Sequence, residues 1–209
     1  MTAADDLIER IRTRLLPTPQ AAEAIAALTP DWIPEGGFRG PPRDAAVLVA
    51  IVRRGELLSV LYTERSPDLR SHSGQIAFPG GKVDPEDDGP AAAALREANE
   101  EVALEPSDAT ILGYLPTYFT GSNFMITPVV ALVVPRGGFT PNPGEVKSVF
   151  EVPLSILMAE ESFGTYRIRR REVEHTTWQI VHDERVIWGI TANLTRRFYE
   201  LALKDDVTL

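Results

Sequence analysis

Apolar residues in the first 28 positions recur every three or four residues, the spacing that places them on one face of a helix. The repeating residues are Leu7, Ile11, Leu15, Ala21, Ile25 and Leu28. Pro17 and Pro19 interrupt the pattern, so we expect an amphipathic helix over Asp6–Leu16 and a second helical stretch after the prolines. A loop rich in glycine and proline follows at Pro34–Pro42, and residues 1–40 are therefore predicted to be a helical extension.

From position 45 the pattern changes to short apolar runs of the kind that form strands. Ala45–Val52 is almost continuously apolar, as in a buried strand, and Leu57–Thr63 follows it across a tight turn centred on Gly55. The other expected elements are strands at Thr110–Tyr114, Ile126–Val134, Thr165–Ile168 and Trp178–Val181, and helices at Pro90–Val102, Pro153–Ala159 and Ile190–Leu203. Hairpins with few helices predict an α+β fold, and 209 residues fit one domain spanning 1–209.

Composition narrows the classes of function. The chain has no cysteine, which excludes disulfides, thiolate metal sites and thiol nucleophiles. A net charge of −9 argues against a nucleic-acid partner. No apolar run approaches the roughly 20 residues that span a bilayer, and the first residues do not resemble a signal peptide. We therefore expect a cytoplasmic protein.

The helix expected at Pro90–Val102 carries an unusual group of carboxylates. Glu97, Glu100 and Glu101 share one face because they are spaced i, i+3 and i+4. Like charges at this spacing repel one another by a few tenths of a kcal/mol, and the end of the helix where they stand disfavours negative charge. A hard divalent cation would remove the repulsion, whereas a solvated acidic surface is the alternative. Arg96, four residues before Glu100, can hold that side chain in place.

The residues around this helix resemble a known family. Gly81, fourteen intervening residues and then Arg96–Leu104 are similar to the Nudix box, a glycine loop followed by a helix of the form Arg-Glu-x-x-Glu-Glu-x-Gly-apolar. The resemblance implies an α/β/α sandwich with a mixed central sheet, a loop–helix–loop metal site, and hydrolysis of a nucleoside diphosphate linked to another moiety. The spacing is one residue longer than the common box. Ala103 replaces the usual glycine, at a cost of roughly 1 kcal/mol if it caps the helix in a left-handed conformation. Asp87 or Asp88 stands where the box usually has a glutamate.

A second motif precedes the box directly. Residues 61–66, which read Leu-Tyr-Thr-Glu-Arg-Ser, are followed by Arg70, Gly74 and Phe78-Pro79-Gly80-Gly81, and this stretch is similar to the one found in coenzyme A pyrophosphatases. Only Tyr62 departs from that pattern. The two motifs together cover Leu61–Leu104. The resemblance implies coenzyme A or a derivative as substrate, Mg²⁺ or Mn²⁺ as cofactor, 4′-phosphopantetheine and adenosine 3′,5′-bisphosphate as products, and a homodimer.

These motifs suggest residues for binding the substrate. Arg65 and Arg70 can make bidentate contacts with phosphate, and Lys82 can add a point charge. Gly80 and Gly81 either let the backbone approach the ligand or simply make a turn. We expect Glu97, Glu100 and Glu101 to hold the metal, and a carboxylate to accept the proton of the attacking water.

Other candidates stay open at this point. Glu145, expected just before an apolar helix, is our choice for a distant carboxylate that serves as ligand or base; Glu151, Glu160 and Glu161 are alternatives. The remaining candidates are a basic cluster of Arg167, Arg169, Arg170 and Arg171, a histidine at His72, and aromatic residues at Tyr118, Phe119 and Phe124. Each has a structural reading as well: a solvated strand edge, a turn, or core packing.

Two alternative functions remain. One is a Nudix hydrolase of another substrate, such as ADP-ribose, a dinucleoside polyphosphate or a damaged nucleotide. The other is a non-catalytic, ligand-sensing Nudix domain, for which a degraded set of carboxylates would be expected. Arg96, Glu97, Glu100 and Glu101 are all present, which favours an enzyme.

Overall fold

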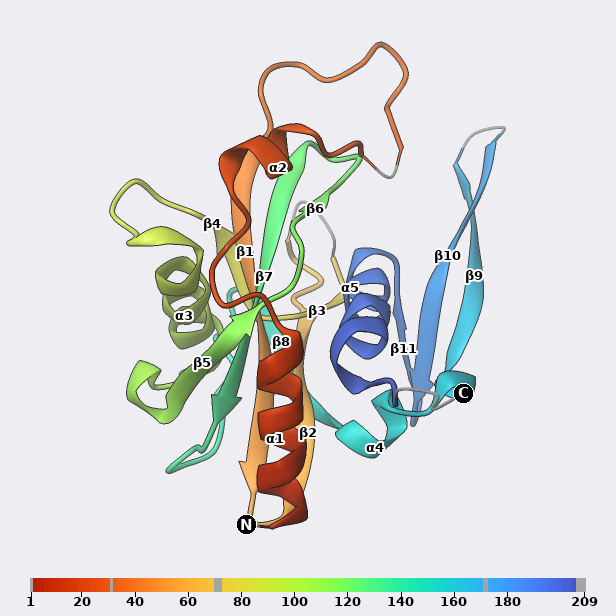
Figure 1. Cartoon of the computed structure of the whole chain (residues 1–209). Helices are drawn as coiled ribbons and strands as arrows, with labels where there is room; N and C mark the ends of the chain where they lie inside the picture. Colours follow the sequence, from red (N-terminus) through yellow and green to blue (C-terminus); the bar gives the residue numbers. More distant parts are fainter. Residues whose placement is uncertain (1, 31, 70–72, 171–172, 206–209) are drawn as a thin grey trace.

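The computed structural model describes residues 2–30, 32–69, 73–170 and 173–205, and within them the chain forms a mixed eight-stranded sheet and a separate three-stranded sheet (Figure 1). The helices are α1 Ala3–Arg14, α2 Ala22–Ala26, α3 Gly89–Val102, α4 Leu154–Leu157 and α5 Ile190–Phe198, with short helical turns η1 Pro106–Asp108, η2 Glu160–Ser162 and η3 Tyr199–Leu203. The strands are β1 Arg43–Arg54, β2 Leu57–Arg65, β3 Ile76–Ala77, β4 Gly80–Lys82, β5 Ala109–Tyr114, β6 Tyr118–Phe119, β7 Phe124–Val133, β8 Val146–Pro153, β9 Phe163–Arg170, β10 Val173–His182 and β11 Arg185–Trp188.

Strand β1 is the centre of the large sheet. It pairs antiparallel with β2 across the predicted hairpin and parallel with β7 over ten positions, from Arg43–Phe124 to Val52–Val133. The short strand β4 pairs with the beginning of β1, and β8 pairs with β2 on its other side. The parallel β1–β7 pair makes the sheet mixed, as the resemblance implied.

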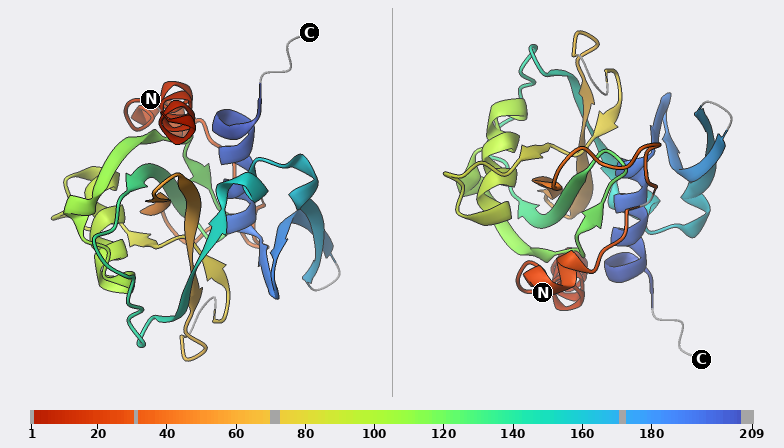
Figure 2. Two further views of the ribbon diagram at one scale, coloured as in Figure 1. Left: turned by 90° about the horizontal axis from the view of Figure 1, so that it is seen from below. Right: turned by 90° about the horizontal axis from the view of Figure 1, so that it is seen from above.

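Alternate residues of β1 point into two different cores because successive side chains of a strand face opposite sides of the sheet. Leu48 and Ala50 pack with α3, whereas Val49 and Ile51 pack with residues of α1 and α5, and all four are fully buried. Two views of the ribbon show α3 on one face of the sheet and both α1 and α5 on the other (Figure 2). The predicted α+β fold with three layers is confirmed.

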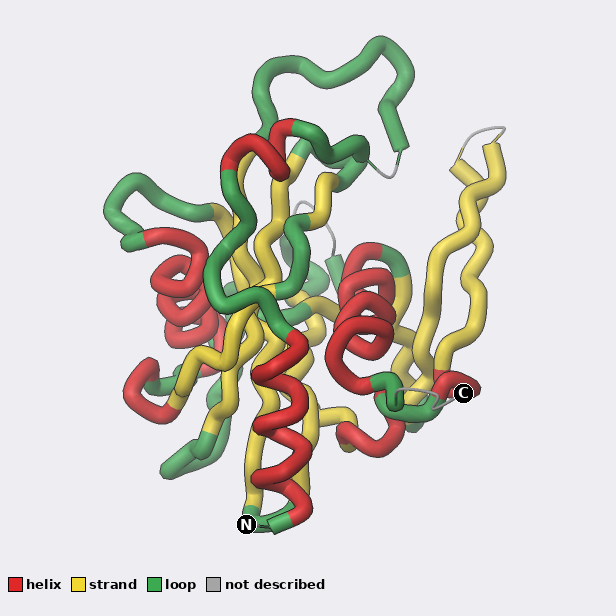
Figure 3. Tube along the Cα trace, viewed as in Figure 1, coloured by secondary structure: helices red, strands yellow, loops and turns green. Residues whose placement is uncertain are grey.

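The three-stranded sheet lies beside α5. Its order is β11-β10-β9, so β10 is central and β9 is an edge strand. Phe163, Ile180 and Ile187 from its three strands join the α1–α5 core. The tube in Figure 3 shows this small sheet standing apart from the large one, with α5 between them. None of the described helices is long and apolar enough to cross a bilayer.

The helices and strands expected from the sequence are present, with shifted ends. Five further strands were not predicted: β3, β4, β6, β8 and β11. One expectation was wrong. Glu145 is followed by strand β8 and not by an apolar helix, because Val146–Pro153 pairs along its length with β2. At the N-terminus, α1 buries Ile8 and Ile11 against the sheet.

Candidate active site

Helix α3 is fixed on the sheet by small residues. Ala94, Ala98 and Val102 are fully buried against β1 and β7, and Pro90 occupies the first turn, where its missing N–H costs nothing. The helix ends at Ala103, which adopts φ 53° and ψ 36°. This is the left-handed cap expected at the position where the Nudix box has glycine.

Burial separates the three glutamates of α3. The side chain of Glu101 is 3% exposed, that of Glu97 is 16% exposed and that of Glu100 is 50% exposed. A solvated acidic surface is therefore the wrong interpretation for Glu97 and Glu101. Burial raises the pKa of Glu101 to about 7 and also raises the pKa of Glu97. The negative charges of Glu100 and Glu145 raise the pKa of Glu97 further, and those of Glu97 and Glu145 do the same for Glu101.

Two groups of the preceding motif compensate part of the charge on Glu101. The backbone N–H of Gly80 donates to Glu101 Oε2 at 3.3 Å, and Arg65 Nη1 lies 3.7 Å from Glu101 Oε1. The Nε of Arg65 is buried and has no hydrogen-bond partner within the described part of the chain. Arg65 therefore stands beside the carboxylates with a donor still available.

Arg96 connects the acidic loop to the helix. Its Nε and Nη2 donate to the two carboxylate oxygens of Asp87 at 3.0 and 2.9 Å, and its other contacts are Glu97 Oε1 at 3.1 Å and the carbonyl of Lys82 at 3.1 Å. The expected contact with Glu100 exists but is long, at 3.5 Å. Hydrogen bonding to Arg96 lowers the pKa of Asp87, so the pair stays charged. Of the two candidate aspartates in the loop, Asp87 is thus a partner of Arg96, whereas Asp88 is exposed.

The glycine pair lies in a strand and not in a turn, and its contact with a ligand stays a prediction. Gly80 and Gly81 lie in β4, paired with Val47 and Ala46 of β1. A Cβ atom at Gly80 would collide with the β1 backbone, and one at Gly81 would collide with the carboxylate of Glu97. The absence of side chains therefore lets β1, β4 and the carboxylates of α3 pack together, which forms the floor of the site.

Glu145 is brought to the same place from a distant part of the sequence. Its charge acts on both Glu97 and Glu101, and its carbonyl accepts from the N–H of Ser66, which ties its loop to the end of β2. The alternatives lie elsewhere: Glu151 bonds to Arg54 and Ser59, Glu160 pairs with Arg196 and Lys204, and Glu161 is exposed. The choice of Glu145 over these residues agrees with its position.

The donor set fits a divalent cation chemically. Four carboxylates lie in the neighbourhood of the glycine floor, and two of them, the buried Glu101 and the partly buried Glu97, have raised pKa values that a bound cation would lower again. They are not gathered into a ready-made metal cage: no three acidic or histidine side chains of the described residues converge closely enough for that. Arg96 holds Glu97, whereas Gly80 and Arg65 hold Glu101.

The other candidates divide into residues that are accounted for and residues that are not described. Arg70, His72 and Arg171 lie outside the described residues, as do the side chains of Arg169 and Arg170. Lys82 is exposed on β4 beside the glycines, and Arg167 is exposed on the edge strand β9. The aromatic candidates have partners in the fold: Phe119 stacks on Phe38, Phe124 lies under Arg43, and Tyr118 is buried beside α5.

Comparison with known proteins shows the family of sequences to which this chain is similar. The NUDIX domain family model matches residues 41–186. A protein of Citrobacter koseri named uncharacterized Nudix hydrolase NudL is 43% identical over 165 residues, covering 79% of this chain and 84% of its own. A protein of the same name from Klebsiella pneumoniae is 43% identical over 162 residues, covering 78% and 82%. A solved structure from Deinococcus radiodurans overlaps with a TM-score of 0.49 at 17% identity, covering 75% of this chain and 83% of that one; this overlap supports no functional inference.

Proposed function

The chain belongs to the Nudix family of hydrolases, and from that premise we propose that it hydrolyses the diphosphate of coenzyme A or of one of its derivatives. One observation carries the choice of substrate. Arg65, which belongs to the motif similar to coenzyme A pyrophosphatases, lies 3.7 Å from Glu101, which belongs to the Nudix helix. The two motifs therefore contribute to one continuous site, in which a substrate diphosphate can contact both.

The proposed division of roles follows from charge and position. Glu97, Glu100 and Glu101, with Glu145 beside them, are the residues that would hold Mg²⁺ or Mn²⁺. When bound, the metal neutralises diphosphate oxygens and makes a bound water more acidic. Arg65 has a buried donor without a partner, and it supplies a fixed positive charge for the diphosphate.

Proton transfer requires a carboxylate that is near the site and not fully engaged elsewhere. Glu145 meets both conditions, because it lies beside Glu97 and Glu101 and no described side chain pairs with its carboxylate. We assign it the role of accepting a proton from the attacking water. Arg96 acts as a positioning residue: it holds Glu97 from the helix side and Asp87 from the loop side.

The reaction then proceeds as an ordinary hydrolysis. Water adds to one phosphorus of the diphosphate, the bridging P–O bond breaks, and the leaving phosphate takes the electron pair. With coenzyme A the products are 4′-phosphopantetheine and adenosine 3′,5′-bisphosphate. Arg70 and Lys82 remain predicted contacts of the substrate phosphates. Gly80 and Gly81 also remain predicted contacts of the substrate, and in addition they let the floor of the site pack.

Several further properties remain predictions. A single domain over 1–209, a cytoplasmic location, a homodimer and the preference for Mg²⁺ or Mn²⁺ follow from the sequence and the family resemblance. Retention of all the box carboxylates favours catalysis over ligand sensing.

A comparison of substrates tests the proposal. The kcat/KM for coenzyme A and for ADP-ribose should be measured with the same enzyme in the presence of Mn²⁺. We expect the value for coenzyme A to be the greater. Turnover of ADP-ribose with inert coenzyme A would contradict the substrate assignment, and binding of both without turnover of either would indicate a sensing domain.

A further inference from the structure

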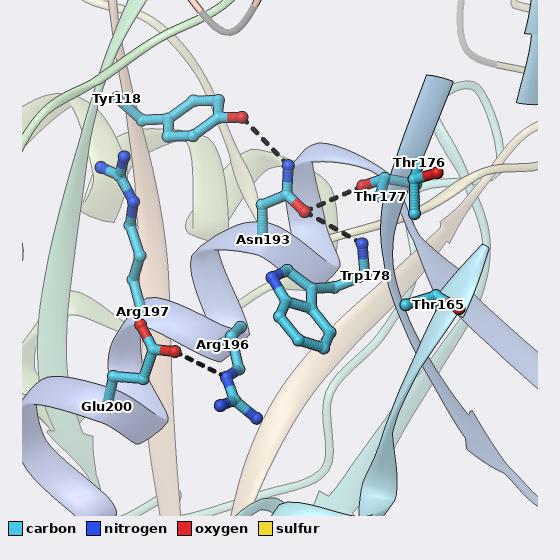
Figure 4. A pocket seen from close by; sticks show the side chains of 9 residues that line it. All are labelled: Tyr118, Thr165, Thr176, Thr177, Trp178, Asn193, Arg196, Arg197 and Glu200. Atoms are coloured by element: carbon cyan, nitrogen blue, oxygen red, sulfur yellow. Dashed lines mark hydrogen bonds and ion pairs between the residues drawn. The ribbon is translucent and has the colours of Figure 1, made fainter. Parts of the chain in front are cut away.

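A pocket of about 440 Å³ lies between α5, β6 and the strands β9 and β10 (Figure 4). Its walls come from Tyr118 on β6, threonines and a tryptophan on β9 and β10, Asn193, Arg196 and Arg197 on α5, and Glu200 on η3. None of its described lining residues belongs to α3, β4 or the loop of Glu145. Because α5 and α3 cover opposite faces of the large sheet, this pocket is separate from the carboxylate site.

One of the two arginines that line the pocket has no carboxylate partner among the described residues. Arg196 is paired, with Glu200 at 2.7 Å and Glu160 at 3.1 Å. Arg197 is different, because among the described residues its guanidinium has no carboxylate partner and only lies 4.6 Å from the centre of the Tyr118 ring. In Figure 4 this guanidinium stands beside Tyr118 at one end of the pocket. An unpaired, half-buried guanidinium is a natural partner for a planar or tetrahedral oxyanion.

The rest of the pocket offers hydroxyl groups on a fixed frame. Asn193 Oδ1 accepts from the Thr177 hydroxyl at 2.8 Å and from the Trp178 N–H at 3.3 Å, and its Nδ2 donates to the Tyr118 hydroxyl at 3.0 Å. These bonds lock β10 and β6 onto α5. Thr165 and Thr176 also line the pocket and are exposed, and their hydroxyls have no hydrogen-bond partner within the described part of the chain.

We propose that this pocket binds a hydroxylated phosphate monoester, such as a sugar phosphate, at a site distinct from the hydrolytic one. Arg197 binds the phosphate with its guanidinium, and the free threonine hydroxyls exchange hydrogen bonds with the hydroxyls of the ligand. The volume lies within the range of roughly 300–1,000 Å³ that is usual for small-molecule sites. It is much larger than a bare phosphate needs, which favours a ligand with an organic body.

Calorimetric titration of ribose 5-phosphate into the full chain with Mg²⁺ present tests the proposal. We expect saturable binding to the wild type, a loss of affinity of about tenfold or more in Arg197→Gln, and a smaller loss in Thr176→Val, which removes one exposed hydroxyl. Arg65→Gln, the matched change at the hydrolytic site, should leave this binding unchanged. Arg197→Gln should in turn leave the hydrolytic rate unchanged.

Three outcomes would overturn the proposal. They are absence of saturable binding to the wild type at millimolar ligand, equal binding by Arg197→Gln, and loss of binding in Arg65→Gln. The last would place the sugar phosphate in the carboxylate site. These three outcomes are all measured by binding and not by turnover of coenzyme A. The sugar-phosphate proposal can therefore fail while the proposed hydrolytic function holds, and the reverse is equally possible.

Discussion

Arg96 donates two parallel hydrogen bonds to the carboxylate of Asp87, at 3.0 and 2.9 Å. These bonds connect the acidic loop before α3 to the helix that carries the site carboxylates. The same guanidinium also contacts Glu97. Asp87 therefore holds Arg96, and Arg96 in turn orients Glu97. Groups that orient metal ligands in this way commonly change metal affinity when they are removed.

Asp87→Asn is expected to weaken this chain of contacts without removing any candidate ligand. The half-saturating Mn²⁺ concentration for hydrolysis should rise by roughly tenfold to a hundredfold. The neighbouring Asp88→Asn is the matched control, because Asp88 is exposed and its side chain makes no capping hydrogen bond. Equal Mn²⁺ dependence of the two variants would contradict a positioning role for Asp87.

Arg65→Gln removes the charge that faces both Glu101 and the expected diphosphate. Loss of charge-assisted hydrogen bonds should lower kcat/KM for coenzyme A by roughly tenfold to a hundredfold, and Arg65→Lys should recover part of it. Steady-state kinetics of the wild type and both variants measures this change in kcat/KM. Arg54→Gln, which removes an arginine paired with Glu151 away from the site, serves as control and should have little effect. Undiminished activity of Arg65→Gln would contradict the proposal that the two motifs form one continuous site.

Burial of Glu101 makes stability of the metal-free protein depend on pH. Its pKa rises from 4.5 to about 7, so the folded state binds this proton more tightly than the unfolded state does. Below pH 4.5 both states are protonated. As pH rises towards 7 the unfolded state releases its proton first, and stability falls by about 1.4 kcal/mol per pH unit, to a total loss of roughly 3 kcal/mol.

Glu101→Gln removes this proton and with it the pH-dependent loss. In urea unfolding with EDTA, the variant should gain roughly 2 to 3 kcal/mol relative to the wild type between pH 5 and pH 8. Glu105→Gln, an exposed glutamate after the same helix, should track the wild type at both pH values. A difference between Glu101→Gln and the wild type that does not change with pH would show that Glu101 is not strained by burial.

Ala103 ends α3 in a left-handed conformation that costs a residue with a side chain more than glycine. Ala103→Gly should therefore raise the free energy of unfolding by about 1 kcal/mol, as measured by urea denaturation. The same substitution at Ala92, within the helix, should lower it by a similar amount. Destabilisation by Ala103→Gly would mean that the side chain at this position contributes packing that outweighs the strain.

The parts of the fold that the sequence predicts are long, regular and well buried. Ala45–Val52 is an almost continuous apolar run that is buried on both faces, and the helix from Pro90 to Val102 buries one face at helical spacing, so local pattern and tertiary structure agree. The short strand Gly80–Lys82 has no such pattern, because its glycines are required by close contacts with β1 and with Glu97, which are distant in the sequence. Strand β8 was missed for a related reason: its residues are partly buried on both sides, which hides the alternation.

The functional site is likewise only partly predictable from the sequence. The i, i+3, i+4 spacing identifies which glutamates share a face, but it does not reveal that Glu101 is buried while Glu100 is exposed. The proximity of Glu145 depends on how β2 and β8 pair, which no local motif encodes. The role of Asp87 as partner of Arg96 likewise depends on the path of the acidic loop.

Product analysis by mass after incubation of coenzyme A with the protein and Mn²⁺ tests the central claim most directly. Glu100→Gln is the variant to compare, because Glu100 is the most exposed box glutamate and its loss should not disturb the fold. Glu105→Gln is the control. We expect 4′-phosphopantetheine and adenosine 3′,5′-bisphosphate from the wild type and Glu105→Gln, and almost none of either product from Glu100→Gln. Intact coenzyme A with all three proteins would contradict the proposed substrate, and equal cleavage by Glu100→Gln would contradict the proposed role of Glu100.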